Sequence, residues 1–331
     1  MSVPLQIVSM GKYLPERQVT ATELELQMGL EPGWIVEKSG VSIRHFVAPG
    51  ESNSTMGAAA MKQALSRANL EFEQLDLMIN ASGSYDYPIP ETSCLIQRAM
   101  GKGDSGVPCF TVDSTCLSFI TALDVAAAFI ASGRYRRIGI VSSEVASRSL
   151  NYKEWESATL LGDGAAAAIV QQAPPDSPSA LLSSRMETYG QGAFHTFVSG
   201  GGNVRHPLHD DVAPDEYTFS MNGLAVLTTS FKRLRSFNKK LFAELDFTLQ
   251  QIDLFIPHQA SRVALEKAQQ LFHLSDAQFM SNLATHGNCI AASIPMALHD
   301  AIASERLHRG MKVCLLGTGA GLSIGGAVLV Y

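Results

Sequence analysis

Three side chains able to do nucleophilic and donor chemistry stand where a strand is expected to give way to a helix or loop. Cys116 lies in FTVDSTCLSFITALDVAAAF, an apolar run followed by a helical pattern, which places the thiol in the first helical turn. His258 ends the apolar run LFIPH, and Asn288 follows Gly287 at the start of another helical stretch. A thiolate nucleophile needs a nearby imidazole, and an oxyanion or enolate needs donors such as His and Asn. If the fold brings them together, the three residues predict a nucleophilic-cysteine site.

Each of these residues also has a plainer structural interpretation. A cysteine beside an apolar helix commonly fills the core, a histidine after a strand is usually structural, and an asparagine at a helix start is ordinarily an N-cap. For Cys116, however, a place at a helix N-terminus predicts a lowered thiol pKa. The remaining cysteines are assigned to the structural interpretation: Cys94, Cys109, Cys289 and Cys314.

The chain repeats itself, and the repeat predicts how these residues meet. LDLMINASGS at 75–84 matches IDLFIPHQAS at 252–261 with an offset of 177 residues, and RRIGIVSSE at 136–144 matches MKVCLLGTG at 311–319 with an offset of 175. Helix-like stretches at 121–133 and 295–307 lie between the members of each half. Each half has the order strand, loop, helix and strand, which favours parallel pairing and a layered α/β fold. The alternative to a duplication is a chain of two unrelated α/β domains. A pseudo-twofold axis would bring equivalent strand-end loops together, which is where ligands bind in α/β sheets.

Composition restricts the class of protein. The 331 residues are 46% hydrophobic, with a net charge of −6, which suggests two compact units and argues against nucleic-acid binding. We place the two units at residues 1–172 and 173–331. Five cysteines without a CxxC pair indicate reduced thiols. We see no signal peptide and no apolar run of the ~18 residues that a membrane span needs, so we expect a cytoplasmic protein that does not contact a membrane.

Two further segments bear on function. Residues 171–216 are rich in Pro, Gly, Ser and Asp and predict loops, whereas 224–245 return to helical periodicity with a basic side at 232–240. That side is either an ordinary solvated face or a docking surface for an acidic partner. The glycine-rich end, 317–331, lacks the helix and acidic residue of a dinucleotide site, and predicts instead a backbone turn that approaches the site as an oxyanion hole.

Several motifs resemble the thiolase superfamily and, within it, the β-ketoacyl-ACP synthase III-like condensing enzymes. They run nearly from end to end: GKYLPERQVT, WIVEKSGVSIRHF, STMGAAA, DSTCLSF, LLGDGAAAA, FSMNGLAV, IPHQAS, HGNCIAASIP and the glycine-rich tail. The resemblance implies a duplicated five-layer α-β-α-β-α sandwich, a homodimer, and a coenzyme A thioester as substrate, with no metal and no other cofactor.

The resemblance also implies roles for individual positions. It assigns the catalytic triad to Cys116, His258 and Asn288, and the oxyanion hole to the backbone N–H groups of Cys116 and Gly321. Substrate-binding positions fall on Trp34, Lys38, Trp155, Ser261 and Ile89, and docking of an acyl carrier protein (ACP) falls on Lys232, Arg233, Arg235 and Arg262. Among the departures from the family, Ser261 replaces an asparagine, Trp155 replaces an arginine, and Ile89 stands where the bacterial fatty-acid enzyme has phenylalanine.

By this resemblance, Cys116 takes an acyl group from an acyl-CoA and condenses it with malonyl-ACP or malonyl-CoA. The product is a β-ketoacyl thioester for fatty acid, polyketide or related specialised synthesis. Alternatives are acyl transfer to an alcohol or amine, and the non-decarboxylative head-to-head condensation of olefin-pathway thiolases. A cysteine hydrolase lacks its signature here, and a non-catalytic partner subunit usually loses the cysteine or histidine that this chain keeps.

Overall fold

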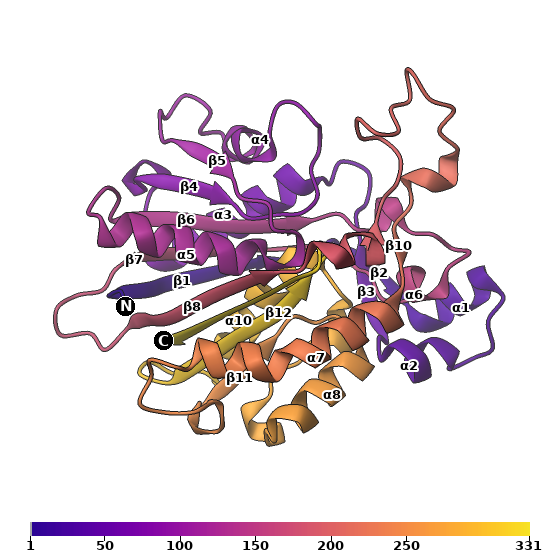
Figure 1. Ribbon diagram of the computed structural model, residues 1–331. Helices are drawn as coiled ribbons and strands as arrows, with labels where there is room; N and C mark the ends of the chain where they lie inside the picture. Colours follow the sequence, from indigo (N-terminus) through magenta and orange to yellow (C-terminus); the bar gives the residue numbers. More distant parts are fainter. Residues whose placement is uncertain (1) are drawn as a thin grey trace.

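The structure, a computed structural model, describes residues 2–331 and is built on two central sheets (Figure 1). The first has five strands in the order β1-β7-β6-β4-β5, and the second has four in the order β11-β12-β13-β8. Two small sheets pair β2 with β3 and β9 with β10. The strands are β1 (Leu5–Tyr13), β2 (Arg17–Thr20), β3 (Ile43–Phe46), β4 (Leu77–Asn80), β5 (Cys109–Thr111), β6 (Arg137–Glu144), β7 (Gly164–Gln172), β8 (Ala180–Thr188), β9 (Thr196–Phe197), β10 (Ser220–Met221), β11 (Leu254–Pro257), β12 (Lys312–Gly319) and β13 (Ser323–Val330).

Helices cover both sheets and fill the space between them, which gives five layers. Helix α3 packs on β1, β6 and β7 from outside, α5 and α10 lie between the sheets, and α7 covers β8 and β13. The helices are α1 (Ala21–Met28), α2 (Trp34–Ser39), α3 (Asn53–Ala68), α4 (Thr92–Ala99), α5 (Ser118–Ala131), α6 (Trp155–Ala158), α7 (Gly223–Leu241), α8 (Arg262–Phe272), α9 (Leu283–His286) and α10 (Ser293–Ala303). The expected five-layer α-β-α-β-α sandwich is confirmed.

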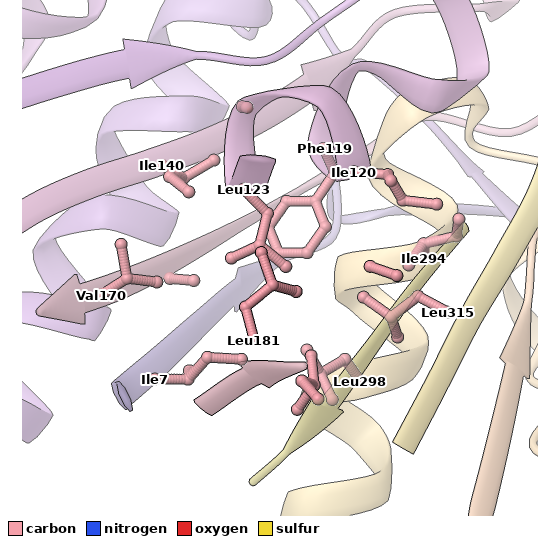
Figure 2. Packing of buried hydrophobic residues seen from close by; sticks show 14 of the residues in the cluster. Ile7, Phe119, Ile120, Leu123, Ile140, Val170, Leu181, Ile294, Leu298 and Leu315 are labelled. Atoms are coloured by element: carbon pink, nitrogen blue, oxygen red, sulfur yellow. The ribbon is translucent and has the colours of Figure 1, made fainter. Parts of the chain in front are cut away.

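The local sequence explains the elements of the middle layer and the strands beside it. The run Ala165–Val170 in β7 has no exposed side chain, because helices cover both faces of its sheet and small alanines let them approach closely. Phe119, Leu123 and Ile294 come from the two central helices and meet side chains of both sheets in one core (Figure 2). This buried layer fixes the starts of α5 and α10 relative to each other.

The predicted repeat is confirmed, and one loop prediction is wrong. Strand β4 pairs parallel with β6, and β11 pairs parallel with β12, so both halves contain the same strand, helix and strand unit. The region 171–216 is not all loop, because β8 contributes nine residues that pair antiparallel with β13. The sequence of this edge strand lacks a clear strand pattern, because polar residues stand at positions that are only partly covered.

A buried ionic network joins the first strand to the middle layer. Asp300 on α10 contacts Lys12 Nζ on β1 at 2.5 Å and accepts a hydrogen bond from Asn282 Nδ2 at 2.8 Å. Rings of two histidines, His286 and His299, lie 3.3 and 3.1 Å from its oxygens. Burial opposes ionisation of Asp300, but hydrogen bonds from His299, Lys12 and Asn282 outweigh it and hold the pKa of this carboxyl well below its usual range.

Replacing Asp300 with asparagine is expected to lower the free energy of unfolding at pH 7 by about 3 kcal/mol, because it leaves Lys12 largely buried without its counter-charge. Urea denaturation measures the change.

The same carboxyl makes stability depend on pH. Because its pKa is lower in the native than in the unfolded chain, Asp300 contributes its full stability above the pKa of the unfolded chain, and this contribution is lost as the pH falls below about 4. Glu73→Gln, which breaks the exposed pair with Lys102, is the control and is expected to cost under about 0.5 kcal/mol. Equal losses in both variants would contradict a network that joins the halves.

Candidate active site

Cys116 lies in a short 3-10 turn, Thr115–Leu117, between β5 and α5. Its neighbour Thr115 has a φ of +52°, an unusual conformation for a β-branched residue, held by Asp113 Oδ1, which accepts from Thr115 N–H at 2.7 Å. Ser118 Oγ accepts from Ser114 N–H at 2.9 Å and donates to the Thr115 carbonyl at 2.7 Å. Side chains on both sides of the cysteine, Asp113 and Ser118, therefore hold the strained turn by hydrogen bonds. The predicted position of Cys116 between a strand and a helix is confirmed.

Two glycines of β12 allow His258 and the cysteine turn to pack closely against this strand. A Cβ on Gly317 would lie 2.8 Å from Cβ of His258, and a Cβ on Gly319 would lie 2.6 Å from Oγ1 of Thr115. Any larger residue at either position would push the histidine or the nucleophile turn away from the strand. The glycine-rich end of the chain thus permits close approach of backbone to the site, as its composition predicted.

His258 directly follows β11 and is 6% exposed. Its N–H donates to the Leu316 carbonyl at 2.8 Å, and its ring Nδ1 finds no hydrogen-bond partner among residues 2–331. Burial lowers the pKa of this imidazole to about 4, so the ring is neutral at physiological pH. A neutral ring can accept a proton on one nitrogen or donate one hydrogen bond from the other.

Asn288 stands before a second 3-10 turn, Ile290–Ala292, which is the counterpart of the cysteine turn. Its Oδ1 accepts from Ile290 N–H at 2.9 Å, and Ile290 has a φ of +47°, matching Thr115. Its Nδ2 lies 3.4 Å from the Ala260 carbonyl, beside the histidine loop. An amide nitrogen carries two N–H groups, so one is left to serve a substrate oxygen.

The three predicted residues line one cavity of about 350 Å³, although they are separated by up to 172 positions in the chain. Apolar side chains from α7 and the start of α8 form its walls, among them Leu227, Phe231 and Val263. Cys116, His258 and Asn288 contribute the polar end together with backbone at Thr318–Ala320. A mainly apolar cavity with a thiol in its wall suits an extended thioester arm.

The resting thiol differs from expectation. Burial, followed by the charge of Glu144, raises the pKa of Cys116 to about 12, so the predicted lowering by the helix N-terminus is wrong. Backbone N–H groups of Cys116 and Ala320 lie near the sulfur and partly offset the rise. Thiol and imidazole are therefore both neutral at rest, and attack on a thioester requires transfer of the thiol proton to a base.

Ala320 is a second backbone position beside the nucleophile. Its N–H lies near the thiol, whereas Gly321 occupies the turn between β12 and β13 with a φ of +127°. The role of Gly321 stays a prediction, and Ala320 is the more direct candidate for the second donor. No property of its side chain could have revealed it, since only the backbone takes part.

Sequence reasoning also missed two acids near the nucleophile. Glu144, at the end of β6, has no exposed surface, and burial raises the pKa of its carboxyl to about 8. Burial also raises the pKa of Asp113, which caps the cysteine turn. A glutamate that ends an apolar strand, RRIGIVSSE, was the available signal in the sequence.

The predicted substrate-binding residues separate into two groups. Lys38, Trp155 and Ser261 line the cavity, whereas Trp34 lies behind Trp155, with ring centroids 5.1 Å apart in an edge-to-face contact. Ser261 also caps α8 through Oγ, which accepts from Ala264 N–H. Ile89 does not line the cavity and is 88% exposed. Its predicted role in a partner's pocket stays a prediction.

Some of the predicted docking cations are exposed on the surface, whereas others are held by neighbouring groups. Lys232 and Arg235 are exposed on α7, while Arg233 stacks 4.2 Å from the Tyr189 ring centroid and donates to the Thr229 carbonyl. Arg262 donates to the carbonyl of Glu37 and lies near Glu266.

The family model for 3-oxoacyl-[acyl-carrier-protein (ACP)] synthase III matches residues 110–190 of this chain. The separate model for the C-terminal part of the same synthase matches residues 242–331. The chain is 32% identical to the β-ketoacyl-[acyl-carrier-protein] synthase III of Syntrophomonas wolfei, over 98% of this chain and 97% of that one. The chain belongs to the 3-oxoacyl-ACP synthase III family. As a member, it is an acyltransferase of the condensing type with a thiolase-like fold.

Other relatives and structures agree. The β-ketoacyl-ACP synthase III of Neisseria meningitidis serogroup C is 31% identical, over 98% of this chain and 99% of that one. The crystal structure of 3-oxoacyl-ACP synthase III from Aquifex aeolicus superposes with a TM-score of 0.88 at 28% identity, covering 99% of this chain and 100% of that one. The OleA protein of Xanthomonas campestris shares the fold, with a TM-score of 0.86 at 23% identity over 100% and 98% of the two chains.

Two kinds of feature are absent from residues 2–331. None of their helices is both long and apolar enough to cross a bilayer. In the same residues, no group of three or more His, Cys, Asp or Glu is arranged to hold a metal ion.

Proposed function

We propose that this enzyme transfers an acyl group from an acyl-CoA to Cys116 and condenses it, with loss of CO₂, with a malonyl thioester. The observation that carries the proposal is the one cavity that Cys116, His258 and Asn288 line together. Family membership supports the same reaction type. Neither a redox cofactor nor a metal enters the proposed steps.

In the first half-reaction, the sulfur of Cys116 attacks the thioester carbonyl while its proton moves to His258. N–H groups of Cys116 and Ala320 receive the tetrahedral oxygen, and each such donor contributes roughly 3–4 kcal/mol. The C–S bond to coenzyme A then breaks, and the departing thiolate takes the proton from His258. The neutral resting state of His258 suits it to accept a proton.

In the second half-reaction, a malonyl thioester enters the emptied channel. The bond between its α-carbon and its carboxylate breaks, CO₂ leaves, and the electron pair becomes an enolate. One N–H of the His258 ring and one of Asn288 Nδ2 stabilise the enolate oxygen. The enolate carbon attacks the acyl-cysteine carbonyl, and the bond from that carbon to the Cys116 sulfur breaks. The β-ketoacyl thioester is released, and the Cys116 thiolate takes a proton from solvent water.

Intact-protein mass after incubation with acyl-CoAs of increasing length tests the proposal. We expect an acyl adduct that is absent from Cys116→Ala and is cleared by malonyl-ACP or malonyl-CoA with release of CO₂. Clearance by an alcohol or amine alone would favour acyl transfer, and clearance by a second acyl-CoA would favour head-to-head condensation. No adduct with any acyl-CoA would overturn the proposal.

We further propose that the malonyl group arrives on an ACP, an acidic protein. Lys232 and Arg235 lie exposed on α7, the same helix whose Leu227 and Phe231 line the cavity, so a carrier bound there would stand close to the site. The chain as a whole is acidic, with a net charge of −6, so a local basic face is the preferred binding surface for an acidic carrier.

Reversing the charge at Lys232, Arg233 and Arg235 to glutamate is therefore expected to raise KM for malonyl-ACP about tenfold. It should leave kcat and KM for malonyl-CoA within about twofold, since free malonyl-CoA does not use this face. Steady-state kinetics with both donors measures the effect. Lys62→Glu, at an exposed position on α3, is the control for a charge reversal away from this face. An unchanged KM for malonyl-ACP would remove this face as the docking surface.

We also propose that two copies of the chain associate through the β5 edge of the first sheet. Strand β5 ends that sheet, and the loop before α4 exposes Tyr85, Tyr87 and Ile89 beside it. Exposed aromatic and aliphatic side chains next to an edge strand are typical of an interface. Light scattering should give twice the chain mass of 35.6 kDa, and Ile89→Lys should lower the dimer fraction.

A further inference from the structure

Glu144 carries a buried carboxyl group that the proposed steps do not use. It ends β6 with no exposed surface, and three donors reach it from the loop after β4. Gly83 N–H donates to Oε1 at 2.7 Å, and the N–H and hydroxyl of Ser84 donate to Oε2 at 2.9 and 2.5 Å. Because three donors of this loop bond to the carboxyl group of Glu144, we infer that the group holds the loop in one position.

The direction of these bonds follows from the surroundings of Ser84. Its Oγ accepts hydrogen bonds from Asn53 Nδ2 at 2.7 Å and from Val145 N–H at 3.1 Å. A hydroxyl oxygen has two lone pairs, so its own proton must point to Glu144. The loop is therefore tied simultaneously to α3, to the end of β6 and to the buried carboxylate.

The loop in turn passes close to both catalytic turns. A Cβ on Gly83 would lie 3.3 Å from Cα of Thr115 and 3.5 Å from Cγ2 of Ile290. Thr115 precedes Cys116, and Ile290 is bonded to the side chain of Asn288. Both have positive φ, which costs about 1–3 kcal/mol for a β-branched residue and persists only when neighbours hold it.

We propose that Glu144 is a positioning residue of the condensing reaction: through Gly83, its carboxylate fixes the cysteine and asparagine turns relative to each other. The inference rests on the proposed function for its catalytic consequence. Glu144 acts through Gly83 and touches no reacting atom, so its loss should reduce the rate of acyl transfer while leaving donor binding unchanged.

Glu144→Gln tests the proposal, because the amide keeps the shape but presents N–H groups where an acceptor is needed. We expect kcat for acylation to fall about 10- to 100-fold with KM within about twofold. Asp76→Asn is the matched control: Asp76 also accepts from two backbone N–H groups, those of Arg136 and Arg137, but at the opposite end of β6. It should change neither parameter.

A second measurement needs no acyl donor. At pH 9, above the pKa of Glu144, its negative charge faces Cys116, with Asp113 as the other acid nearby. Glu144→Gln removes that charge, so alkylation of Cys116 by iodoacetamide should become about threefold faster or more while acylation becomes slower. A merely structural role would slow both reactions together. Failure of wild type to form any acyl adduct would overturn the proposed function but would not affect this alkylation result.

Gly83→Ala supplies the test if Glu144→Gln does not fold. The added methyl group presses on Thr115 without touching the carboxylate bonds, so kcat should fall to a similar extent while alkylation stays near the wild-type rate. Acylation by Glu144→Gln within twofold of wild type would overturn the inference. So would parallel losses of acylation, alkylation and thermal stability.

Discussion

Cys116→Ala is expected to lose condensing activity by at least roughly 10⁴-fold and to form no acyl adduct, because the covalent intermediate has no other attachment point. The variant should fold, since the half-buried thiol leaves only a small cavity. Acylation followed by intact mass and release of coenzyme A measures the first half-reaction. Decarboxylation of malonyl-ACP can be followed separately by release of CO₂.

Cys94→Ala is the matched control, because Cys94 is also half-buried but lies on α4, where its thiol donates to the Glu91 carbonyl. It should keep wild-type acylation within about twofold. An adduct that persists in Cys116→Ala and disappears in Cys94→Ala would move the nucleophile to the other cysteine and contradict the assigned site.

His258→Ala is expected to retain slow acylation but to lose condensation by roughly 10²–10⁴-fold, since the enolate then lacks one of its two side-chain donors. Acyl-enzyme should therefore accumulate and resist malonyl-ACP. His308→Ala, at an exposed position, is the control and should turn over normally. Rapid clearance of the adduct in His258→Ala would show that the histidine is not needed for the second step.

The acid side of the pH profile provides an independent check on His258. Burial lowers the pKa of the imidazole to about 4, so the ring stays neutral from neutral pH down to near that value. Condensation should show no inflection near the ordinary imidazole value of ~6.5. Stability has the opposite dependence: between pH ~6.5 and 4 the unfolded chain binds the proton and the native chain does not, so stability falls as the pH falls.

The sequence by itself determined the repeat and most of the triad's placement. Apolar periodicity and strand-end polar residues are local properties, and they suffice to place Cys116, His258 and Asn288 at equivalent loops of two similar halves. Family motifs then supplied the five-layer arrangement, which the structure confirms. A residue that acts only through its backbone, such as Ala320, carries no local signal of this kind.

Only the tertiary structure decided the electrostatics of the site. A helix N-terminus near Cys116 predicts an acidic thiol, but burial and the charge of Glu144 reverse the direction, and burial depends on chain segments far away in sequence. The same holds for Glu144 and Gly83, which lie 61 positions apart and meet only because β4 pairs with β6. Sequence pattern determines which elements form, whereas the pKa of a group and the fit of a loop depend on what the completed fold places around them.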